Sequence, residues 1–353
     1  GEHFSEELYQ KMAENGWLGA VIPEEYGGVA LGYVDLICIL EEFGTGLMPE
    51  PLISSQILGG NTLLLAGTEE QKQEWLPKIA EGATKFTLAT YEAAGHYTLN
   101  HVETSAANHD DGFLLNGAKE LVTDAKSADK IIVSARTSGD ATDESGITLF
   151  LVDASNAGVT LTDRATMDVP NYAEVALNDV VVTQADVIGE VGEGLATLVH
   201  TIDRANVALC AEMCGGMQES LRRTVEYTQE RVQFDRVIGS FQAVKHKAAN
   251  MYVAMESARY SMYFAAMAVD NDMPEAERSI SGAKALCSDN YLAITKEAIQ
   301  LHGGIGYTDE HDIHFFYKRA QATATTFGDS MYHRERYMQE MAKTQAESAT
   351  STK

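Results

Sequence analysis

The chain has 353 residues, 45% of them hydrophobic, so its length favours two domains or one large layered domain. Its 26 Lys and Arg side chains stand against 52 Asp and Glu, which gives a formal net charge of -26. Nucleic acids and anionic lipids are bound chiefly by surplus Lys and Arg, so this excess of acid excludes both as partners. No run of about 18 apolar residues occurs, and the sequence therefore predicts no membrane-spanning helix.

The cysteines argue against a disulfide framework, because only Cys38, Cys210, Cys214 and Cys287 are present and they are widely spaced. Cys210 and Cys214 lie one helical turn apart, but no second Cys or His pair completes a metal site. We therefore predict small buried thiols and no metal. The opening GEHFSEELYQ lacks the basic and apolar regions of a signal peptide, and we expect a reducing cytoplasm.

The first 85 residues predict helices. Apolar side chains recur at helical spacing over residues 4–15, 34–46 and 50–65. A further short helix is expected from Glu69, where Trp75 and Leu76 supply the apolar side chains. We interpret residues 1–85 as an N-terminal helical domain.

From Phe86 the pattern changes to short, β-branched segments bounded by turn residues. The expected strands are 86–90, 113–117, 130–136, 147–152 and 159–162. Asn116-Gly117 is a pair typical of hairpin turns. Residues 86–187 therefore predict a middle antiparallel β domain or small barrel.

Beyond Gly194 the pattern is helical again. The expected helices are long and amphipathic, and they cover 194–230, 241–270, 274–302 and 328–346. Long helices with short connections pack as antiparallel neighbours, so residues 188–353 predict a four-helix bundle. The fold class is α+β, with a helical, a β and a second helical domain in chain order.

Six motifs follow one another along almost the whole chain. They are GWLGAVIPEEYGG (16–28), TYEAAGHY (90–97), FLLNGAKELVTDA (113–125), DRANVALCAEMCGG (203–216), ERVQFDRVIGSFQAVKHKAANM (230–251) and LHGGIGYTDE (301–310). Read in this order, the series resembles the acyl-CoA dehydrogenase family. The resemblance implies the three-domain fold, FAD held at a subunit interface, an acyl-CoA substrate and an electron-transferring flavoprotein as acceptor. It also implies oxidation of the thioester to a trans-2-enoyl-CoA by a homotetramer or an α2β2 heterotetramer.

The same resemblance assigns the cofactor contacts. Arg231, Gln233 and Phe234 match a segment that contacts the FAD of the neighbouring subunit, and a guanidinium suits a pyrophosphate because its donors form a fixed fork. The other residues that the resemblance places at the cofactor in the helical domain are Gln242, Gln300, Gly303, Gly304 and Ser330.

In the β domain, Thr123 matches the family's threonine that hydrogen-bonds the flavin, whereas Leu121 replaces the usual aromatic side chain. Tyr91 and Glu92 stand where Thr-Glu is usual, and 95–97 reads Gly-His-Tyr in place of Gly-Ser-Asp. We expect cofactor contacts from Tyr91, Glu92 and Thr123, in a flavin environment altered by these replacements.

The catalytic base departs from the family's commonest pattern. Most members carry a Glu at the position of Gly328, and Asp329 is one residue away, which turns a side chain by about 100° around a helix. A minority, including isovaleryl enzymes, carry the Glu on the first bundle helix, where this chain has Asp203 followed by Arg204. By this resemblance Asp203 is the base and Arg204 supports it.

Other interpretations stay open at this point. Asp203 pairs only with Arg204 if the chain is an FAD-binding partner subunit of a heteromeric dehydrogenase, and Asp329 is the base if the chain is similar to nitroalkane oxidases. Altered chemistry, as in an oxidase or a desulfinase, is a further alternative. The stretch 328–336 is similar to subfamilies that act on branched or bulky CoA esters, including steroid side chains.

Overall fold

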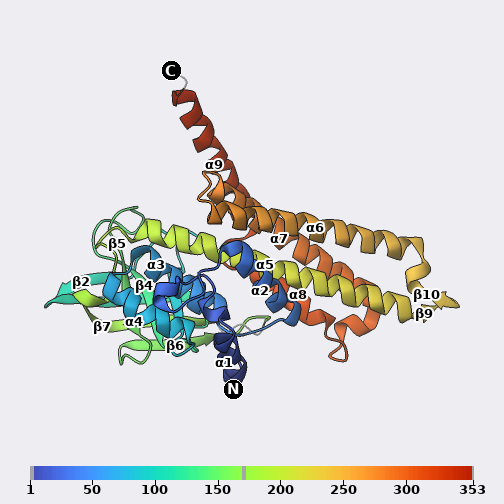
Figure 1. The fold of residues 1–353 in the computed structure, drawn as a ribbon, viewed down its shortest axis with the longest axis horizontal. Helices are drawn as coiled ribbons and strands as arrows, with labels where there is room; N and C mark the ends of the chain where they lie inside the picture. Colours follow the sequence, from blue (N-terminus) through green and yellow to red (C-terminus); the bar gives the residue numbers. More distant parts are fainter. Residues whose placement is uncertain (1–3, 169–171, 352–353) are drawn as a thin grey trace. The chain divides into compact units, whose positions relative to one another are not determined.

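The computed structural model describes residues 4–168 and 172–351. The chain divides into two compact units (Figure 1). The first comprises Gly1–Gly32 and Pro49–Ala205, and the second comprises Tyr33–Met48 and Asn206–Lys353. Helices, then strands, then long helices follow in chain order, which confirms the predicted fold class. The domain limits at residues 85 and 187 stay a prediction.

The helices of the first unit are short. They are α1 (Glu6–Glu14), a π-helix (Ile53–Gly60), α3 (Asn61–Ala66) and α4 (Glu69–Ala80), with 3₁₀ turns at Trp17–Gly19 and Glu24–Tyr26. The hydroxyl of Thr68 accepts from the N–H of Gln71 at 3.2 Å, and the Gln71 side chain accepts from the N–H of Thr68 at 3.0 Å. This reciprocal capping box fixes where α4 starts. The helix predicted over 50–65 is thus a rare π-helix followed by α3.

The β domain is one eight-stranded sheet in the order β6-β7-β3-β2-β4-β5-β8, with β1 paired to β4. Its strands are β1 (Phe86–Ala89), β2 (Ser105–His109), β3 (Gly112–Thr123), β4 (Lys130–Arg136), β5 (Ile147–Asp153), β6 (Val159–Arg164), β7 (Tyr172–Thr183) and β8 (Val187–Ile188). The pairs β1–β4 and β2–β4 are parallel, and the others are antiparallel. Buried apolar side chains from both halves of the sheet meet in one core, in which Phe113 and Phe150 lie edge to face at 5.1 Å.

The hairpin predicted at Asn116-Gly117 is wrong. These residues lie inside β3, where Gly117 pairs with Leu177 of β7 across a register shift, and the β2–β3 turn is at Asp110 and Asp111. Pairing over twelve residues with β7 outweighs the local turn preference of an Asn-Gly pair. The strands β2, β7 and β8 had no counterpart among the predicted segments.

The second unit is built from long helices. They are α2 (Tyr33–Gly46), most of α5 (Gly194–Glu230), α6 (Gln242–Asp270), α7 (Ala276–His302), α8 (Ile313–Thr325) and α9 (Ser330–Ser351). A short hairpin of β9 (Val232–Gln233) and β10 (Arg236–Val237) joins α5 to α6. The helix α8 was not predicted. Among the described residues, no helix is both long enough and apolar enough to cross a membrane.

Glycine allows α2 and α5 to touch through their backbones. A Cβ on Gly44 would lie 1.8 Å from the carbonyl oxygen of Glu212, and one on Gly215 would lie 1.8 Å from that of Glu41. Residue 215 therefore accepts no side chain without separating the helices. Cys210 and Cys214, on the same helix, are buried free thiols, as is Cys287 on α7, while Cys38 is exposed.

Candidate functional site

The end of β3, where the sequence places a flavin contact, is irregular. The pairing of β3 with β7 shifts register between Lys119 and Val122, and Thr123 then pairs with Tyr172. Leu121 has φ +50 and is 56% exposed, and Asp124 has φ +55. Two non-glycine residues in the left-handed region, beside a bulge, hold the backbone of Thr123 away from a regular strand.

Hydrogen bonds from the π-helix and from β1 hold this bulge in place. The Ser54 hydroxyl, on the π-helix, donates to the Asp124 carboxylate at 2.6 Å, and the Thr87 hydroxyl of β1 donates to the carbonyl of Thr123 at 2.6 Å. The side chains of Ser54 and Thr87 are fully buried, so both hydroxyl donors are shielded from water. A π-helix frequently marks a functional site, and this one positions the predicted flavin segment. No sequence motif singled out Ser54.

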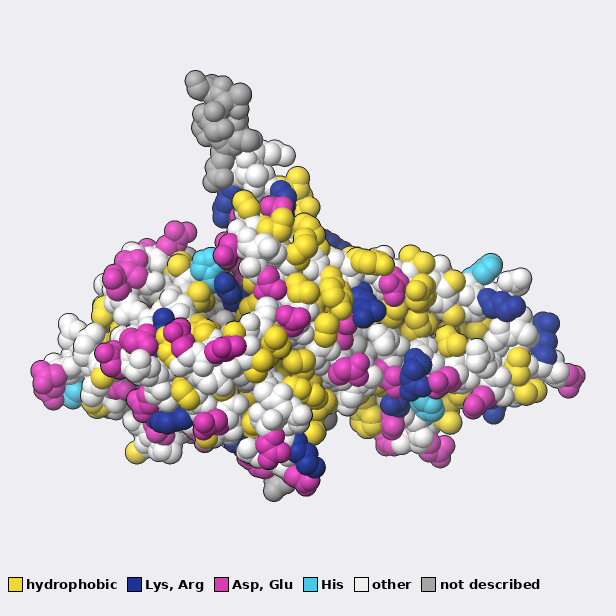
Figure 2. All heavy atoms as spheres, viewed as in Figure 1, with side chains coloured by type: hydrophobic (Ala, Val, Ile, Leu, Met, Phe, Trp, Pro, Cys, Tyr) yellow, Lys and Arg dark blue, Asp and Glu magenta, His cyan; other side chains and the backbone are white. Residues whose placement is uncertain are grey.

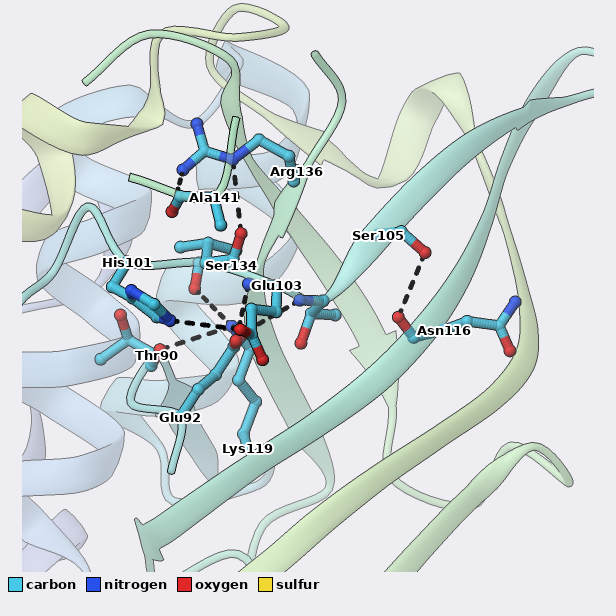
Figure 3. A network of polar contacts seen from close by, with 12 residues as sticks. Thr90, Glu92, His101, Glu103, Ser105, Asn116, Lys119, Ser134, Arg136 and Ala141 are labelled. Carbon is cyan, nitrogen blue, oxygen red and sulfur yellow. Dashed lines mark hydrogen bonds and ion pairs between the residues drawn. The ribbon is translucent and has the colours of Figure 1, made fainter. Parts of the chain in front are cut away.

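Glu92 is committed to contacts within the β domain. Its carboxylate accepts from the N–H groups of Glu103 at 2.6 Å and Thr104 at 3.0 Å and from the ammonium of Lys119 at 2.6 Å (Figure 3). Although burial raises the pKa of Glu92, Lys119 and the other donors hold that pKa below its ordinary value. Three donors already occupy the side chain that was predicted to contact the cofactor. Its neighbour Tyr91 accepts the Glu120 N–H at its carbonyl, 2.8 Å away.

Asp203 lies in the third turn of α5 and is 3% exposed. Arg204 is half-buried and donates to the carbonyl of His200 at 3.3 Å. Side chains of consecutive residues on a helix point about 100° apart and do not face each other. The helix therefore directs the side chains of Asp203 and Arg204 towards different neighbours.

The turn between α8 and α9 contains Gly328, the position at which the sequence resemblance predicts the family's usual base. Phe327 has φ +58 and Gly328 has φ +115, and a Cβ on Gly328 would lie 2.6 Å from both His333 Nε2 and Tyr332 Cδ1. This backbone admits no glutamate at residue 328 without rearrangement. Asp329 accepts from the N–H of Tyr332 at 2.8 Å, so its carboxylate is the N-cap of α9.

Lys284, fully buried on α7, holds the same turn. Its ammonium donates to the carbonyls of Gly328 at 2.8 Å, Thr323 at 3.1 Å and Ala324 at 3.4 Å, which include carbonyls of the last turn of α8. Burial lowers the pKa of Lys284 to about 8. The sequence offered no signal for this residue beyond a lysine on a helix.

The predicted nucleotide contacts after α5 are exposed. Gln233 and Arg236 pair across a two-residue turn in which Phe234 and Asp235 have φ +56 and +59, as in the type I′ turns that hairpins favour. Phe234 is 85% exposed at this tip. Arg231 is exposed and forms no ion pair with any described residue. Gln242 is the exposed first residue of α6.

A second predicted segment lies beside this hairpin. Tyr227, in the last turn of α5, stacks on His302 of α7 with ring centroids 4.5 Å apart, and burial lowers the pKa of His302. Gly303 has φ +66 and Gly304 follows, and no atom lies within 4 Å of a Cβ built on either. Gln300, Gly303 and Gly304 are exposed, so a ligand can approach this backbone closely.

The predicted residues of the second unit fall in two separate places. Lys284 contacts the turn next to Asp329 and Ser330, whereas Gly303 lies 19 positions further along the chain, just past the end of α7. A rise of 1.5 Å per residue separates these two positions by about 28 Å. Asp329 and Ser330 are therefore not brought together with Arg231 and Gly304 inside one chain.

These features suit a large anionic dinucleotide. In the second unit, the exposed guanidinium of Arg231 supplies a fork of donors, and Gly303 and Gly304 leave space beside an exposed backbone. In the first unit, Leu121 is an exposed apolar side chain two residues before Thr123. Among the described residues, no cluster of His, Cys, Asp or Glu could hold a metal ion. Taken one by one, these features are of the kind expected in a flavin-dependent oxidoreductase.

The comparisons with known proteins agree with this class. Family models match three consecutive regions: acyl-CoA dehydrogenase N-terminal domain (1–83), middle domain (87–180) and C-terminal domain (192–342). The chain belongs to the acyl-CoA dehydrogenase family, whose members are FAD-dependent and act on CH–CH bonds.

Individual relatives cover most of the chain. The 3-(aryl)acrylate reductase of Clostridium sporogenes is 32% identical over 93% of this chain and 88% of the relative. The caffeyl-CoA reductase-Etf complex subunit CarC of Acetobacterium woodii is 31% identical over 89% and 84%. The solved structure of butyryl-CoA dehydrogenase from Megasphaera elsdenii superposes with a TM-score of 0.91 at 27% identity, covering 96% of this chain and 90% of that one.

Proposed function

We propose that the chain catalyses α,β-dehydrogenation of a branched or bulky acyl-CoA thioester to a trans-2-enoyl-CoA, with Asp203 as the base. The observation that carries this proposal is the α8–α9 turn. The backbone at Gly328 has no room for a glutamate side chain, and the Asp329 carboxylate caps α9. Asp203 is then the carboxylate left at a position where family members carry a base.

Proton removal is the task of this chain's own side chains. The α-carbon of the thioester loses its proton to the Asp203 carboxylate, and the bound FAD supplies the acceptor for the hydride from the β-carbon. Asp is one methylene shorter than Glu, so the substrate must approach α5 more closely for transfer at hydrogen-bond distance. Arg204, the residue after Asp203, donates to the carbonyl of His200. We propose that Arg204 supports the base from this position.

Two matched variants test this assignment. Asp203→Asn keeps shape and removes the proton acceptor, so flavin bleaching by acyl-CoA should slow by about 10²- to 10⁴-fold while FAD stays bound. Asp329→Asn keeps the cap, because Asn caps helices as well as Asp, and should bleach at close to the wild-type rate. The proposal is wrong if Asp203→Asn reacts normally, and the reverse pattern would make Asp329 the base.

The substrate range follows from a panel of CoA esters. The subfamily similarity of residues 328–336 supports branched or bulky esters, with steroid side chains among them. Straight short-chain, branched and steroid side-chain CoA esters would be compared by the rate of flavin bleaching. Faster bleaching by a straight short-chain ester than by every bulky one would contradict the proposed substrate class.

We also propose that FAD is bound between copies of the chain in a homotetramer, or in an α2β2 heterotetramer with a paralogue. Support comes from α7, which rises about 28 Å from Lys284, the residue that contacts the α8–α9 turn, to Gly303, so the two sets of predicted residues lie at different places along this helix. Exposed apolar side chains also follow one stripe of α6, as Figure 2 shows in yellow; they are Tyr252, Val253, Tyr260, Phe264 and Met267. Light scattering of the purified holoprotein tests the assembly, and a flavin-loaded monomer would exclude it.

The partner that takes the electrons is proposed to be an electron-transferring flavoprotein. The Acetobacterium woodii relative is named as a subunit of a complex with such a protein. The four free cysteines support a reducing compartment, and we propose the cytoplasm. If the reduced protein consumes oxygen rapidly without this partner, an oxidase becomes the better description.

The second candidate function is an FAD-binding partner subunit without a base of its own. The observation in its favour is the same α8–α9 turn, which lacks the usual glutamate. Expression of the chain alone separates the two. A stable, flavin-loaded oligomer that bleaches with acyl-CoA supports the enzyme, and an obligate need for a paralogue supports the partner subunit.

A further inference from the structure

Lys119 has a side chain that is completely buried inside the β domain. Removing an ammonium from water is unfavourable unless it is paired and hydrogen-bonded. Apolar side chains of similar volume would often give equal or greater stability at such a site. A buried lysine at this position therefore calls for a role other than filling the core.

The contacts of Lys119 join three parts of the β domain. Its ammonium donates to Glu92 at 2.6 Å, to the hydroxyl of Ser134 on β4 at 3.0 Å, and to the carbonyl of Thr90 just after β1 at 3.4 Å. Figure 3 shows these side chains converging on one point, with Lys119 reaching them from β3. One cation thus fixes β3 against the segment that leaves β1.

Glu92, the partner of Lys119, also holds the loop that follows it. Its two carboxylate oxygens accept from the N–H groups of Glu103 and Thr104, and so close the loop of residues 92–104 upon itself. The rings of Tyr91 and Tyr97 pack edge to face at 6.4 Å. The shape of the loop depends on a charged residue 92, and that charge depends on Lys119.

The same lysine precedes the bulge of β3. The register shift begins at Lys119, Leu121 follows in the left-handed region, and the Glu120 N–H donates to the Tyr91 carbonyl at 2.8 Å. Lys119 therefore sits where the loop and the bulge meet. Ser54 and Thr87 hold only the far side of the bulge, at Thr123 and Asp124.

We propose that Lys119, acting through Glu92, positions the loop at Tyr91 and the bulge at Leu121–Thr123 against the flavin. The inference rests on the proposed function, because it deepens the same site. Lys119 is a positioning residue, since its ammonium is used up by Glu92, Ser134 and Thr90 and is shielded from any ligand.

The test uses the purified holoprotein and reads the bound flavin, without acyl-CoA. Lys119→Met leaves Glu92 charged, buried and without its cation, so it should lower the melting temperature, raise the Kd for FAD about 10-fold or more, and change the visible circular dichroism of the flavin. The double variant Lys119→Met/Glu92→Gln removes the stranded charge and should regain melting temperature. It should keep the altered flavin signal, because one amide oxygen replaces the two carboxylate oxygens that close the loop.

Two further variants serve as a milder change at the same site and as a control. Ser134→Ala removes one acceptor of Lys119 and should shift the flavin signal in the same direction by a smaller amount, even if Lys119→Met does not fold. Lys130→Met removes a partly exposed ion pair to Asp153 on the same sheet and should leave the flavin signal and the Kd unchanged.

A purely structural role predicts a different pattern. In that case the flavin signal and the Kd would follow the melting temperature and return to wild type in the double variant. Wild-type flavin properties in every Lys119 variant would equally overturn the proposal. A wild-type protein that binds FAD but bleaches with no acyl-CoA would contradict the proposed reaction and leave this positioning test intact.

Discussion

The hydroxyl of Ser54 donates a 2.6 Å hydrogen bond to the carboxylate of Asp124, across 70 residues of sequence. The donor lies on a π-helix, and the acceptor has φ +55 directly after Thr123. The bond ties an unusual helix to an unusual backbone at the place where the flavin contact is predicted. A strained backbone persists only where surrounding contacts stabilise it, and the hydrogen bond from Ser54 is one of these contacts.

Ser54→Ala is expected to destabilise the protein by about 1–3 kcal/mol, because the buried carboxylate of Asp124 loses this hydrogen bond. Ser155→Ala is the matched control, since Ser155 donates to Asp153 at 2.5 Å on the surface, where water replaces the bond. That change should stay within about 0.5 kcal/mol. Urea unfolding of both variants measures the difference, and equal losses would mean that burial of the Ser54 bond has no energetic effect.

Two glycines are expected to respond differently to alanine. Gly328→Ala places a Cβ at φ +115 and 2.6 Å from His333 Nε2 and Tyr332 Cδ1, so it should cost at least about 1 kcal/mol of stability. Gly304→Ala meets no atom within 4 Å and should change stability by less than about 0.5 kcal/mol. The Gly304 variant should instead bind FAD more weakly, because a side chain now stands in the open space.

Thermal unfolding and FAD titration of the two variants separate these effects. Normal FAD affinity in Gly304→Ala would mean that the backbone at Gly304 does not contact FAD. A stable Gly328→Glu variant that bleaches faster than wild type would show that the α8–α9 turn can accept the family's usual base after all.

Arg231→Gln is expected to weaken FAD binding without loss of stability. The side chain is exposed, and a charge-assisted hydrogen bond contributes about 1.5–3 kcal/mol, so the Kd should rise about 10- to 100-fold. Lys343→Met, at an exposed cation on α9, serves as the control for the change in net charge. Fluorescence titration of the apoprotein with FAD gives both constants, and the same Kd in both variants would rule out a specific contact from Arg231.

His333 is expected to make the protein sensitive to acid. Burial, with smaller effects of Lys284 and Arg336, lowers the pKa of His333 to about 3, against an ordinary value of 6.5. Between these values the unfolded chain binds the proton and the folded chain does not, so stability is full above pH 6.5 and falls towards pH 3. The slope contributed by one proton is about 1.4 kcal/mol per pH unit.

His333→Gln removes this titration while its amide can still donate to the carbonyl of Phe327, which His333 Nε2 contacts at 3.0 Å. The pH dependence of the unfolding free energy between pH 7 and 4 should therefore be shallower in the variant. An unchanged slope would mean that other groups cause the loss of stability in acid.

Features that depend on neighbouring residues in the chain were predictable. The helix predicted over 194–230 has the same limits as α5, and each of the five predicted strands overlaps a strand of the sheet. Helical periodicity and β-branched runs are short-range signals, so they survive without knowledge of the fold. The motifs around Arg231 and Gly303 likewise identified the family and its FAD, which the comparisons confirm.

Features that depend on distant residues were not predictable. Asn116-Gly117 has the sequence of a hairpin turn but lies within β3, because pairing with β7 offers more hydrogen bonds and burial than a local turn. The helix α8 was missed, and with it the turn in which Gly328 and Asp329 take their roles.

The sequence by itself determined the family, the order of its three structural regions and the short list of carboxylates that could act as a base. Only the tertiary structure decided how those side chains are used. Glu92 is held by Lys119 and two backbone amides, Asp329 caps α9, and Asp203 is buried on α5. The physical reason is that the role of a carboxylate depends on which donors surround it and on how much water reaches it, and residues far apart in the chain set both.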